Sequence, residues 1–336
     1  MARLAVGIGI GVTAALVAAG VVALTMLPRG EDSTAPTGSA EPPGFLALQF
    51  PGIDWETADP AIFDAVSGGP RRDGIPAIDN PDFVPIADIS WGDDVRAIVL
   101  DDGTNAVRVY SYNVLVWHEI VNDTVGGVPV AVTFCPLCGS ASVFERTLPD
   151  GTDTTFGVSG ALIESNMVMF DRATEGLWQQ STGRALAGEH VGTELALHPF
   201  QLLTLGEVRA SHPGALVMSD DTGHARDYEN NPYGDYDEND VFYFAPSTLD
   251  GRYPAKMIVV AFLVGEQRVA VPWLALREVG TFEAEVEGES VTLRVEGGEL
   301  DVRDAGGQSL PFYFEMWFSW AVQNQESGIV LDPEAG

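Results

Sequence analysis

The segment VAVTFCPLCGSASVFER, residues 130–146, contains both cysteines of the 336-residue chain. β-branched and aromatic residues, which favour strands, stand on both sides of the CPLCG sequence. Within that sequence Pro136 fixes one backbone φ angle and Gly139 permits a left-handed one. The segment therefore predicts two strands joined by a tight cysteine turn, and not the strand-to-helix junction of a thioredoxin-type dithiol.

Similar short strand-forming runs recur along the chain with turn residues between them. They include AIVL from Ala97, AVRVYSYNVLV from Ala106 and NMVMF from Asn166. Helical periodicity is clear only in places, such as residues 199–212. With 46% hydrophobic residues the chain can bury a large core. We expect one large, β-rich α+β domain spanning residues 45–336.

Two stretches of this domain resemble each other. GTNAVRVYSYNVLVWHE from Gly103 and GEQRVAVPWLALRE from Gly265 each pair a turn with alternating apolar residues and end in Glu. The likeness is consistent with two related β units. Common strand chemistry also produces such a likeness, and the second stretch has no cysteine or histidine at the matching place.

The N-terminal residues 1–28 predict a membrane segment. Residues 4–27 carry no charge and, as a helix, are long enough for the hydrocarbon layer of a bilayer. A removed signal peptide is the alternative. Residues 29–44 are rich in Pro, Gly and Ser and predict a flexible linker. We expect a single-pass protein of the cell membrane with the bulk of the chain extracytoplasmic and the membrane as its partner.

The charge of the chain excludes one class of partner. The sequence contains 49 Asp and Glu against 17 Lys and Arg, a formal net charge of −32. Because nucleic acids are polyanions, this surface repels them. We therefore expect no nucleic-acid partner.

The cysteine turn is open to three interpretations: a metal knuckle, a redox dithiol or a short structural disulfide. Two cysteines cannot complete a four-ligand site, so a metal such as Zn, Cu or Fe needs further ligands. WHEIVND, residues 117–123, supplies His118 as the leading third ligand beside Cys135 and Cys138, with Glu119 as an acid–base group. The alternative for His118 is a buried histidine that satisfies hydrogen bonds.

A second set of polar residues follows the cysteine turn. Asp171, Arg172, Trp178 and Gln180 are candidates for binding a polar ligand or cofactor, and a turn-stabilising ion pair between Asp171 and Arg172 is the alternative. The sequence GVSG lacks the spacing of a serine nucleophile elbow. Residues 220–240 are strongly acidic but do not match a calcium-binding loop, so we expect an exposed acidic loop there.

Several phrases in a fixed order carry a family resemblance. They are SGGPRRDGIPAIDNPDF, WHEIVND, VAVTFCPLCGSASVFER, FGVSG, NMVMFDRATEGLWQQSTG and MWFSWA, between Ala61 and Trp320. Together they resemble the prokaryotic family catalogued as domain of unknown function 3179. The resemblance implies a membrane-linked or exported protein built around WHEIVND and CPLCG, without an assigned activity. In family members a histidine often follows the last phrase, where this chain has Gln323 and Asn324.

Taken together, these patterns predict a membrane-anchored extracytoplasmic protein with a metal or thiol-redox site. The site is formed by the two cysteines and His118. The alternative is a non-catalytic ligand-binding module of the cell envelope, in which the cysteines only brace a hairpin.

Overall fold

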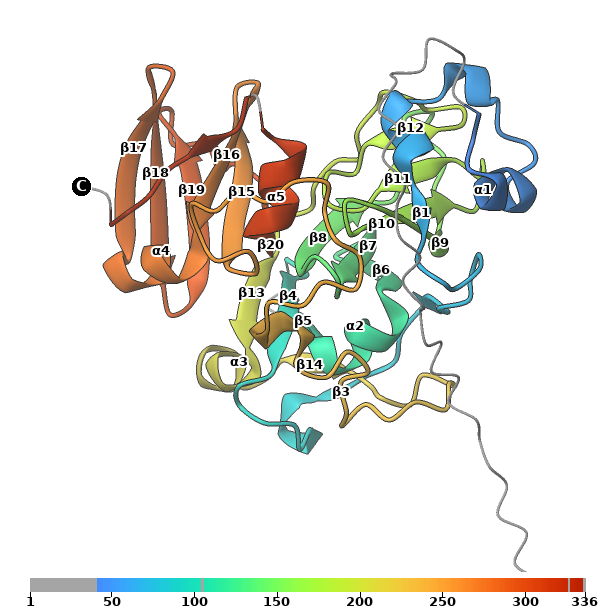
Figure 1. Cartoon of the computed structure of the whole chain (residues 1–336). Coiled ribbons are helices and arrows are strands. Elements are labelled where there is room, and N and C mark those ends of the chain that lie inside the picture. Colours follow the sequence, from blue (N-terminus) through green and yellow to red (C-terminus); the bar gives the residue numbers. More distant parts are fainter. Residues whose placement is uncertain (1–40, 104–105, 326, 335–336) are drawn as a thin grey trace, which may run out of the picture. The chain divides into compact units, whose positions relative to one another are not determined.

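The structure, a computed structural model, describes residues 41–103, 106–325 and 327–334. Residues 39–336 form one compact unit. The predicted membrane segment and most of the predicted linker lie outside the described residues. Among the helices that the structure describes, none is long and apolar enough to cross a membrane. The unit is a β-rich α+β domain, as predicted, with short helices set between many strands (Figure 1).

The described strands form four sheets. The first sheet has the order β1 (Val66–Ser67), β9 (Phe156–Ile163), β10 (Asn166–Asp171), β11 (Leu177–Gln179), β12 (Ala185–Ala187). The second has the order β13 (Gln201–Thr204), β4 (Arg96–Asp101), β5 (Val107–Ser111), β14 (Leu216–Met218), β3 (Phe83–Pro85). The third has the order β2 (Ile78–Asp79), β6 (Ile120–Val125), β7 (Val128–Cys135), β8 (Ser140–Glu145), β20 (Phe312–Met316), β15 (Ile258–Val264), β16 (Gln267–Pro272), β21 (Ile329–Val330). The fourth has the order β17 (Thr281–Val286), β18 (Glu289–Glu296), β19 (Glu299–Asp304).

Strand β20 lies between β8 and β15 and so connects the earlier and the later strands of the eight-stranded sheet. It pairs antiparallel with β15 along most of its length, from Ile258↔Met316 to Phe262↔Phe312. On its other side it meets β8 at Phe314↔Ala141. Because β8 begins directly after the cysteine turn, this pairing brings β20 to that turn.

Four of the five α-helices in the described residues have seven residues and directly follow a strand. They are α2 (Tyr112–His118), α3 (Leu205–Ser211), α4 (Trp273–Val279) and α5 (Trp317–Gln323), and the remaining helix is α1 (Gly44–Gln49). The expectation of extended structure through residues 106–116 was wrong for its second half, which is α2. The Ser111 side chain accepts the backbone N–H of Asn113 and caps α2, and the buried residues Tyr112, Leu115 and His118 repeat every three positions. The helical expectation for residues 199–212 holds only for α3, since the first part is β13.

The two stretches that resemble each other in sequence share their order of elements. The first folds as β5, α2 and β6, and the second as β16, α4 and β17. Each helix ends at a residue with positive φ, Glu119 in the first stretch and Gly280 in the second. The two segments are therefore alike in local structure as well as in sequence.

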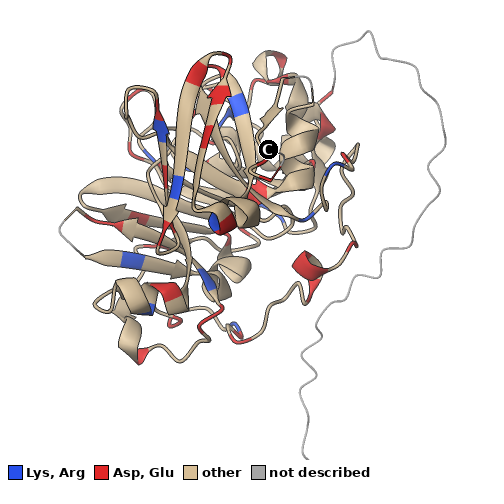
Figure 2. Cartoon of the chain, turned by 90° about the vertical axis from the view of Figure 1, so that its left-hand side faces the viewer, with Lys and Arg blue, Asp and Glu red and all other residues tan. Residues whose placement is uncertain are grey.

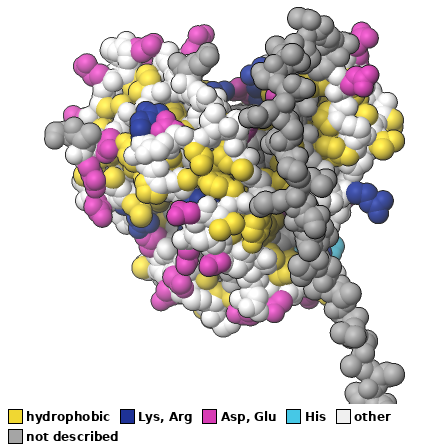
Figure 3. Space-filling model, viewed as in Figure 1, with side chains coloured by type: hydrophobic (Ala, Val, Ile, Leu, Met, Phe, Trp, Pro, Cys, Tyr) yellow, Lys and Arg dark blue, Asp and Glu magenta, His cyan; other side chains and the backbone are white. Residues whose placement is uncertain are grey.

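Four groups of buried apolar residues stabilise the domain. The largest lies between the second, third and fourth sheets, and another surrounds the cysteine turn and contains Phe144, Met169 and Trp178. A third packs α1 against β10, β11 and β12 (Figure 1). Acidic residues outnumber basic ones over the described surface, as the net charge predicts (Figures 2 and 3).

Candidate functional site

The cysteine turn has the predicted strand–turn–strand geometry. β7 ends at Cys135 and β8 begins at Ser140. Gly139 has a φ of +60°, which favours glycine, and a Cβ atom there would lie 2.9 Å from Cγ of Met316, so another residue would have to displace the Met316 side chain. Both cysteines are free thiols, and both are buried.

The Cys138 sulfur lies in a buried polar network. Asn166 Nδ2 is 3.2 Å from the sulfur, 3.2 Å from Ser140 Oγ and 2.9 Å from Gln180 Oε1. Since an amide has two N–H donors, it serves two of these three acceptors at a time. The Ser140 hydroxyl is 3.1 Å from the sulfur and also reaches Gln180 Oε1, so its one proton goes to either acceptor. The sulfur therefore has two donors available that can stabilise a thiolate.

These contacts separate the acidities of the two thiols. Burial alone raises the pKa of Cys138, but hydrogen bonds from Cys135, Ser140 and Asn166 outweigh it and lower that pKa to about 7. Burial, together with the hydrogen bond to Cys138, raises the pKa of Cys135. Its thiol also lies 3.5 Å from the carbonyl oxygen of Ser165. Cys138 is thus the more acidic thiol of the pair, about half ionised at pH 7, and Cys135 remains protonated.

Two buried carboxyl groups interact with the Cys138 thiol. Glu119 ends α2 with a φ of 60°, and its Oε1 lies 3.5 Å from the Tyr233 hydroxyl. Burial and the negative charge of Cys138 raise the pKa of Glu119 to about 8. Burial and the same thiolate raise the pKa of Glu315, on β20, to about 8. Both carboxyls are therefore mostly protonated at neutral pH and can donate a proton near the sulfur.

His118 does not join the cysteines. Its Nδ1 lies 2.7 Å from the Pro76 carbonyl oxygen, and its Nε2 lies 2.7 Å from the Tyr228 hydroxyl. Burial lowers the pKa of His118 to about 4, so the ring is neutral. The part of the chain that the structure describes contains no group of three His, Cys, Asp or Glu side chains arranged to hold a metal ion. His118 thus matches the alternative of a buried histidine that satisfies hydrogen bonds.

The predicted ligand-binding set separates into three places. Asp171 accepts hydrogen bonds from the Trp178 indole N–H at 3.0 Å and from two backbone N–H groups of the loop after β10. Arg172 forms an ion pair with Asp73 at 2.8 Å, so the expected Asp171–Arg172 pair is not formed. Asp171 and Trp178 therefore stabilise a turn. Gln180 alone lies at the cysteine site.

The sequence interpretation missed Ser140, Asn166 and Glu315. Each is a polar residue within or next to an apolar strand, and each is buried. A buried polar side chain in an otherwise apolar run is costly unless it is hydrogen bonded, and this is the signal that points to them. Nothing local in the sequence indicates that all three face one sulfur.

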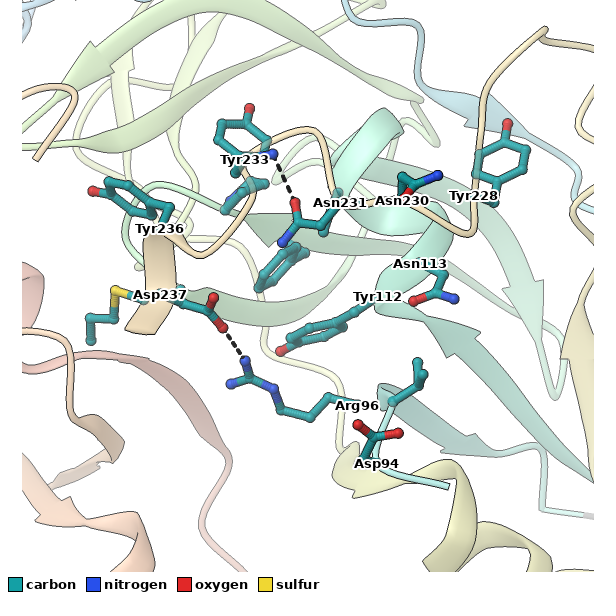
Figure 4. Close-up of a pocket in the computed structure, with 16 residues that line it drawn as sticks. Asp94, Arg96, Tyr112, Asn113, Tyr228, Asn230, Asn231, Tyr233, Tyr236 and Asp237 are labelled. Carbon is teal, nitrogen blue, oxygen red and sulfur yellow. Dashed lines mark hydrogen bonds and ion pairs between the residues drawn. The ribbon is translucent and has the colours of Figure 1, made fainter. Parts of the chain in front are cut away.

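A pocket of about 200 Å³ adjoins the cysteine turn (Figure 4). We call it the tyrosine pocket because Tyr112, Tyr228, Tyr233 and Tyr236 line it. The last three belong to residues 220–240, an acidic segment that is mostly exposed, as expected, while its tyrosines turn inward. The wall nearest the thiols consists of Phe134, Pro136 and Gly139, which adjoin the two cysteines in sequence.

The fold and the site define a β-rich α+β protein with a buried dithiol beside a tyrosine-lined pocket. The chain belongs to the family described as protein of unknown function (DUF3179), whose model matches residues 72–311, more than half of the chain. The matched residues include the cysteine turn, Asn166, Gln180 and the tyrosine pocket up to Asp237. Neither the curated proteins nor the solved structures contain a match to this chain.

Proposed function

We propose that this chain is a thiol-based redox protein in which Cys135 and Cys138 alternate between a dithiol and an internal disulfide. The observation that carries the proposal is the surroundings of the Cys138 sulfur. This fully buried atom has both an amide and a hydroxyl donor, from Asn166 and Ser140. A cysteine that only fills space in a core needs neither donor.

The two thiols have different roles in such a cycle. The Cys138 thiolate attacks one sulfur of an oxidised disulfide, the S–S bond of the oxidant breaks, and a mixed disulfide forms as the first thiolate leaves. Cys135 then gives its proton to the Glu119 carboxylate, which has already protonated the first leaving thiolate, and attacks the Cys138 sulfur. The internal disulfide forms, the second thiolate leaves, and the oxidant has taken up two electrons. Glu119, which is mostly protonated, protonates a leaving thiolate.

A metal centre with Zn, Cu or Fe is a second candidate, and it has less support. A structural site needs four ligands and a catalytic one at least three. The cysteines supply two, and both nitrogens of the predicted third ligand, His118, already have hydrogen-bond partners. Thiol redox chemistry requires no third ligand.

The non-catalytic alternative rests on the tyrosine pocket. In that case the pocket binds a ligand and the cysteines only brace the hairpin between β7 and β8. It gives no reason for two donors and two neutral carboxyls around a single sulfur. We further propose that residues 1–28 anchor the protein in the cell membrane with the domain outside the cytoplasm, a proposal supported by the sequence of that segment.

The test is a thiol count on the full chain, equilibrated anaerobically in glutathione buffers of increasing potential. Alkylation is carried out in denaturant so that buried thiols react, and the products are counted by mass. We expect both thiols to disappear together over a defined range of potential. Cys138→Ser should abolish the transition, whereas Ser159→Ala, which removes a buried hydroxyl elsewhere, should leave it unchanged.

Two outcomes would contradict the proposal. Thiols that stay reduced at every potential would favour the hairpin-bracing alternative. Stoichiometric metal that is lost in Cys138→Ser and also in His118→Ala would favour the metal centre.

A further inference from the structure

A second pocket, of about 390 Å³, adjoins the tyrosine pocket. Asp94 and Arg96 line both. Ile258 of the second pocket is the cross-strand partner of Met316 of the first, and Lys256 Nζ of the second lies 3.4 Å from the ring centroid of Tyr236 of the first. The two pockets are therefore neighbours that share part of their lining.

The second pocket has an apolar lining, and we call it the apolar pocket. Leu202, Leu203, Met257, Ile258, Trp273 and Leu274 line it. Leu274 is 68% exposed, so an apolar side chain remains in contact with water at this place. A hydrocarbon chain lying here would remove that surface from water. The lining thus fits an alkyl or isoprenoid chain.

The cations at the two pockets already have partners. Arg96 is paired with Asp237 at 2.7 Å, and Arg277 is paired with Glu207. Lys256 donates to the backbone carbonyl oxygens of Tyr236 and Val241. Because these cations are paired, Asp94 adds a carboxyl group to both pockets and the chain is strongly acidic, the site favours a neutral ligand over an anionic one.

The tyrosine pocket fits a flat ring. A cavity of about 150 Å³ binds benzene, so the volume of about 200 Å³ holds one substituted six-membered ring. The rings of Tyr112 and Phe134 lie 4.0 Å apart at its wall. The Tyr112 hydroxyl and the Asn113 side-chain amide line this pocket, and neither has a hydrogen-bond partner among the described residues. They provide donors for oxygen atoms on the ring.

We infer that the two pockets together bind a quinone with an apolar side chain, and that this quinone is the oxidant of Cys135 and Cys138. The inference rests on the proposed function. The quinone ring occupies the tyrosine pocket against Phe134, Pro136 and Gly139, and its chain occupies the apolar pocket. The Cys138 thiolate and the Cys135 thiol form one S–S bond as the Cys135 S–H bond breaks. The two electrons released, the Cys135 proton and the proton of the Glu119 carboxyl convert the quinone to its hydroquinone.

The predicted location of the protein agrees with this ligand. Quinones with long apolar chains dissolve in the bilayer, and the N-terminal segment is predicted to hold the domain near one. Tyr233 connects the pocket to the protonated carboxyl of Glu119, since it lines the pocket and its hydroxyl lies 3.5 Å from Glu119 Oε1. A proton can pass from this carboxyl toward a ring oxygen as the quinone is reduced.

The binding test uses a benzoquinone with a decyl chain, and the same ring with a methyl group in its place. Calorimetric titration is performed on the full chain carrying Cys135→Ser and Cys138→Ser, so that binding is measured without turnover. We expect the decyl compound to bind more tightly. Leu274→Asp, which places a charge in the apolar pocket, should weaken its binding by on the order of tenfold. The matched control is Leu48→Asp, at a residue that is 84% exposed and lines neither pocket.

The oxidation test counts thiols in the wild-type full chain after anaerobic exposure to the decyl quinone or to oxidised glutathione. Loss of both thiols with the quinone, together with formation of hydroquinone, supports the inference. No binding, binding that ignores the Leu274 change, or oxidation by glutathione but not by the bound quinone would overturn the inference and leave the proposed function standing. Thiols that neither oxidant removes would overturn both.

Discussion

Replacing Asn166 by alanine should make the Cys138 thiol a weaker acid. The amide of Asn166 lies 3.2 Å from the sulfur and is one of the donors available to it, beside the Ser140 hydroxyl and the Cys135 thiol. A hydrogen bond stabilises the thiolate more than it stabilises the neutral thiol, so losing the Asn166 donor shifts the equilibrium toward the protonated form. Ser140 and Cys135 remain as donors.

The size of the shift follows from the energy of one hydrogen bond to a charged group, about 1.5–3 kcal/mol. Sulfur is a weak acceptor, so the lower end applies. Since one pKa unit corresponds to about 1.4 kcal/mol, we expect the pKa of Cys138 to rise by about one unit from its value of about 7. At pH 7 the thiolate fraction then falls from about one half to about one tenth.

The assay is a pH titration of the ultraviolet absorbance of the thiolate in the reduced protein, which has two cysteines. Ser159→Ala is the matched control, because Ser159 donates a buried hydrogen bond to the Val168 carbonyl oxygen and contacts neither thiol. Ser159→Ala should leave the pKa of Cys138 unchanged. An Asn166→Ala protein that is folded and titrates like the wild type would refute the assignment of Asn166 as the donor to the sulfur.

Three further changes test the electrostatics and the structural assignments. Burial raises the pKa of Glu119 from 4.5 to about 8 in the folded chain, so the folded state holds an extra proton between these values, and the free energy of unfolding falls as pH rises through this window, by about 1 kcal/mol per pH unit. Because Glu315 contributes a slope of its own, Glu119→Gln should lower the slope by about 1 kcal/mol per pH unit and not abolish it, in denaturant unfolding measured from pH 5 to pH 8. An unchanged slope would show that the Glu119 carboxyl is ionised. Tyr110→Phe should lower the free energy of unfolding by about 1–3 kcal/mol, because Tyr110 donates a hydrogen bond to the buried carboxylate of Asp123 at 2.6 Å. Urea unfolding measures this loss, with Tyr243→Phe at an exposed tyrosine as the control. Asp171→Asn should also lower the free energy of unfolding by about 1–3 kcal/mol, since the Asp171 oxygens accept hydrogen bonds from backbone N–H groups of a turn. It should leave the pH titration of the Cys138 thiol unchanged, and an altered titration would instead link Asp171 to the site.

The local structure of the cysteine turn could be predicted because its causes are local. Strand-forming residues flank the turn, and Pro136 and Gly139 set its backbone angles. The strand prediction failed at residues 112–118, where Val114 and Val116 favour a strand. There a serine cap and the burial of Leu115 and His118 outweigh the strand propensity. Strand or helix propensity is a weak guide wherever tertiary packing decides which of the two conformations forms.

The candidate site could be predicted only in part. Cys135, Cys138 and Glu119 come from sequence motifs, and the structure brings all three together. His118 is next to Glu119 in sequence but faces Pro76 and Tyr228, because α2 ends between the two residues with a change to positive φ. Gln180 belongs to the site because Ser140 and Asn166 donate hydrogen bonds to it. From the sequence alone, Gln180 is grouped with the predicted ligand-binding set.

The sequence by itself determined the strand-rich class of the domain, its acidic surface and the turn that carries both thiols. Each of these follows from composition or from neighbours within a few residues. Only the tertiary structure decided what surrounds the Cys138 sulfur, because its neighbours Glu119, Asn166, Tyr236 and Glu315 come from segments far apart in the chain. The pairing of β20 with β8 brings Glu315 to the turn, whereas Asn166 comes from β10 in another sheet. Such long-range contacts leave no local pattern in the sequence.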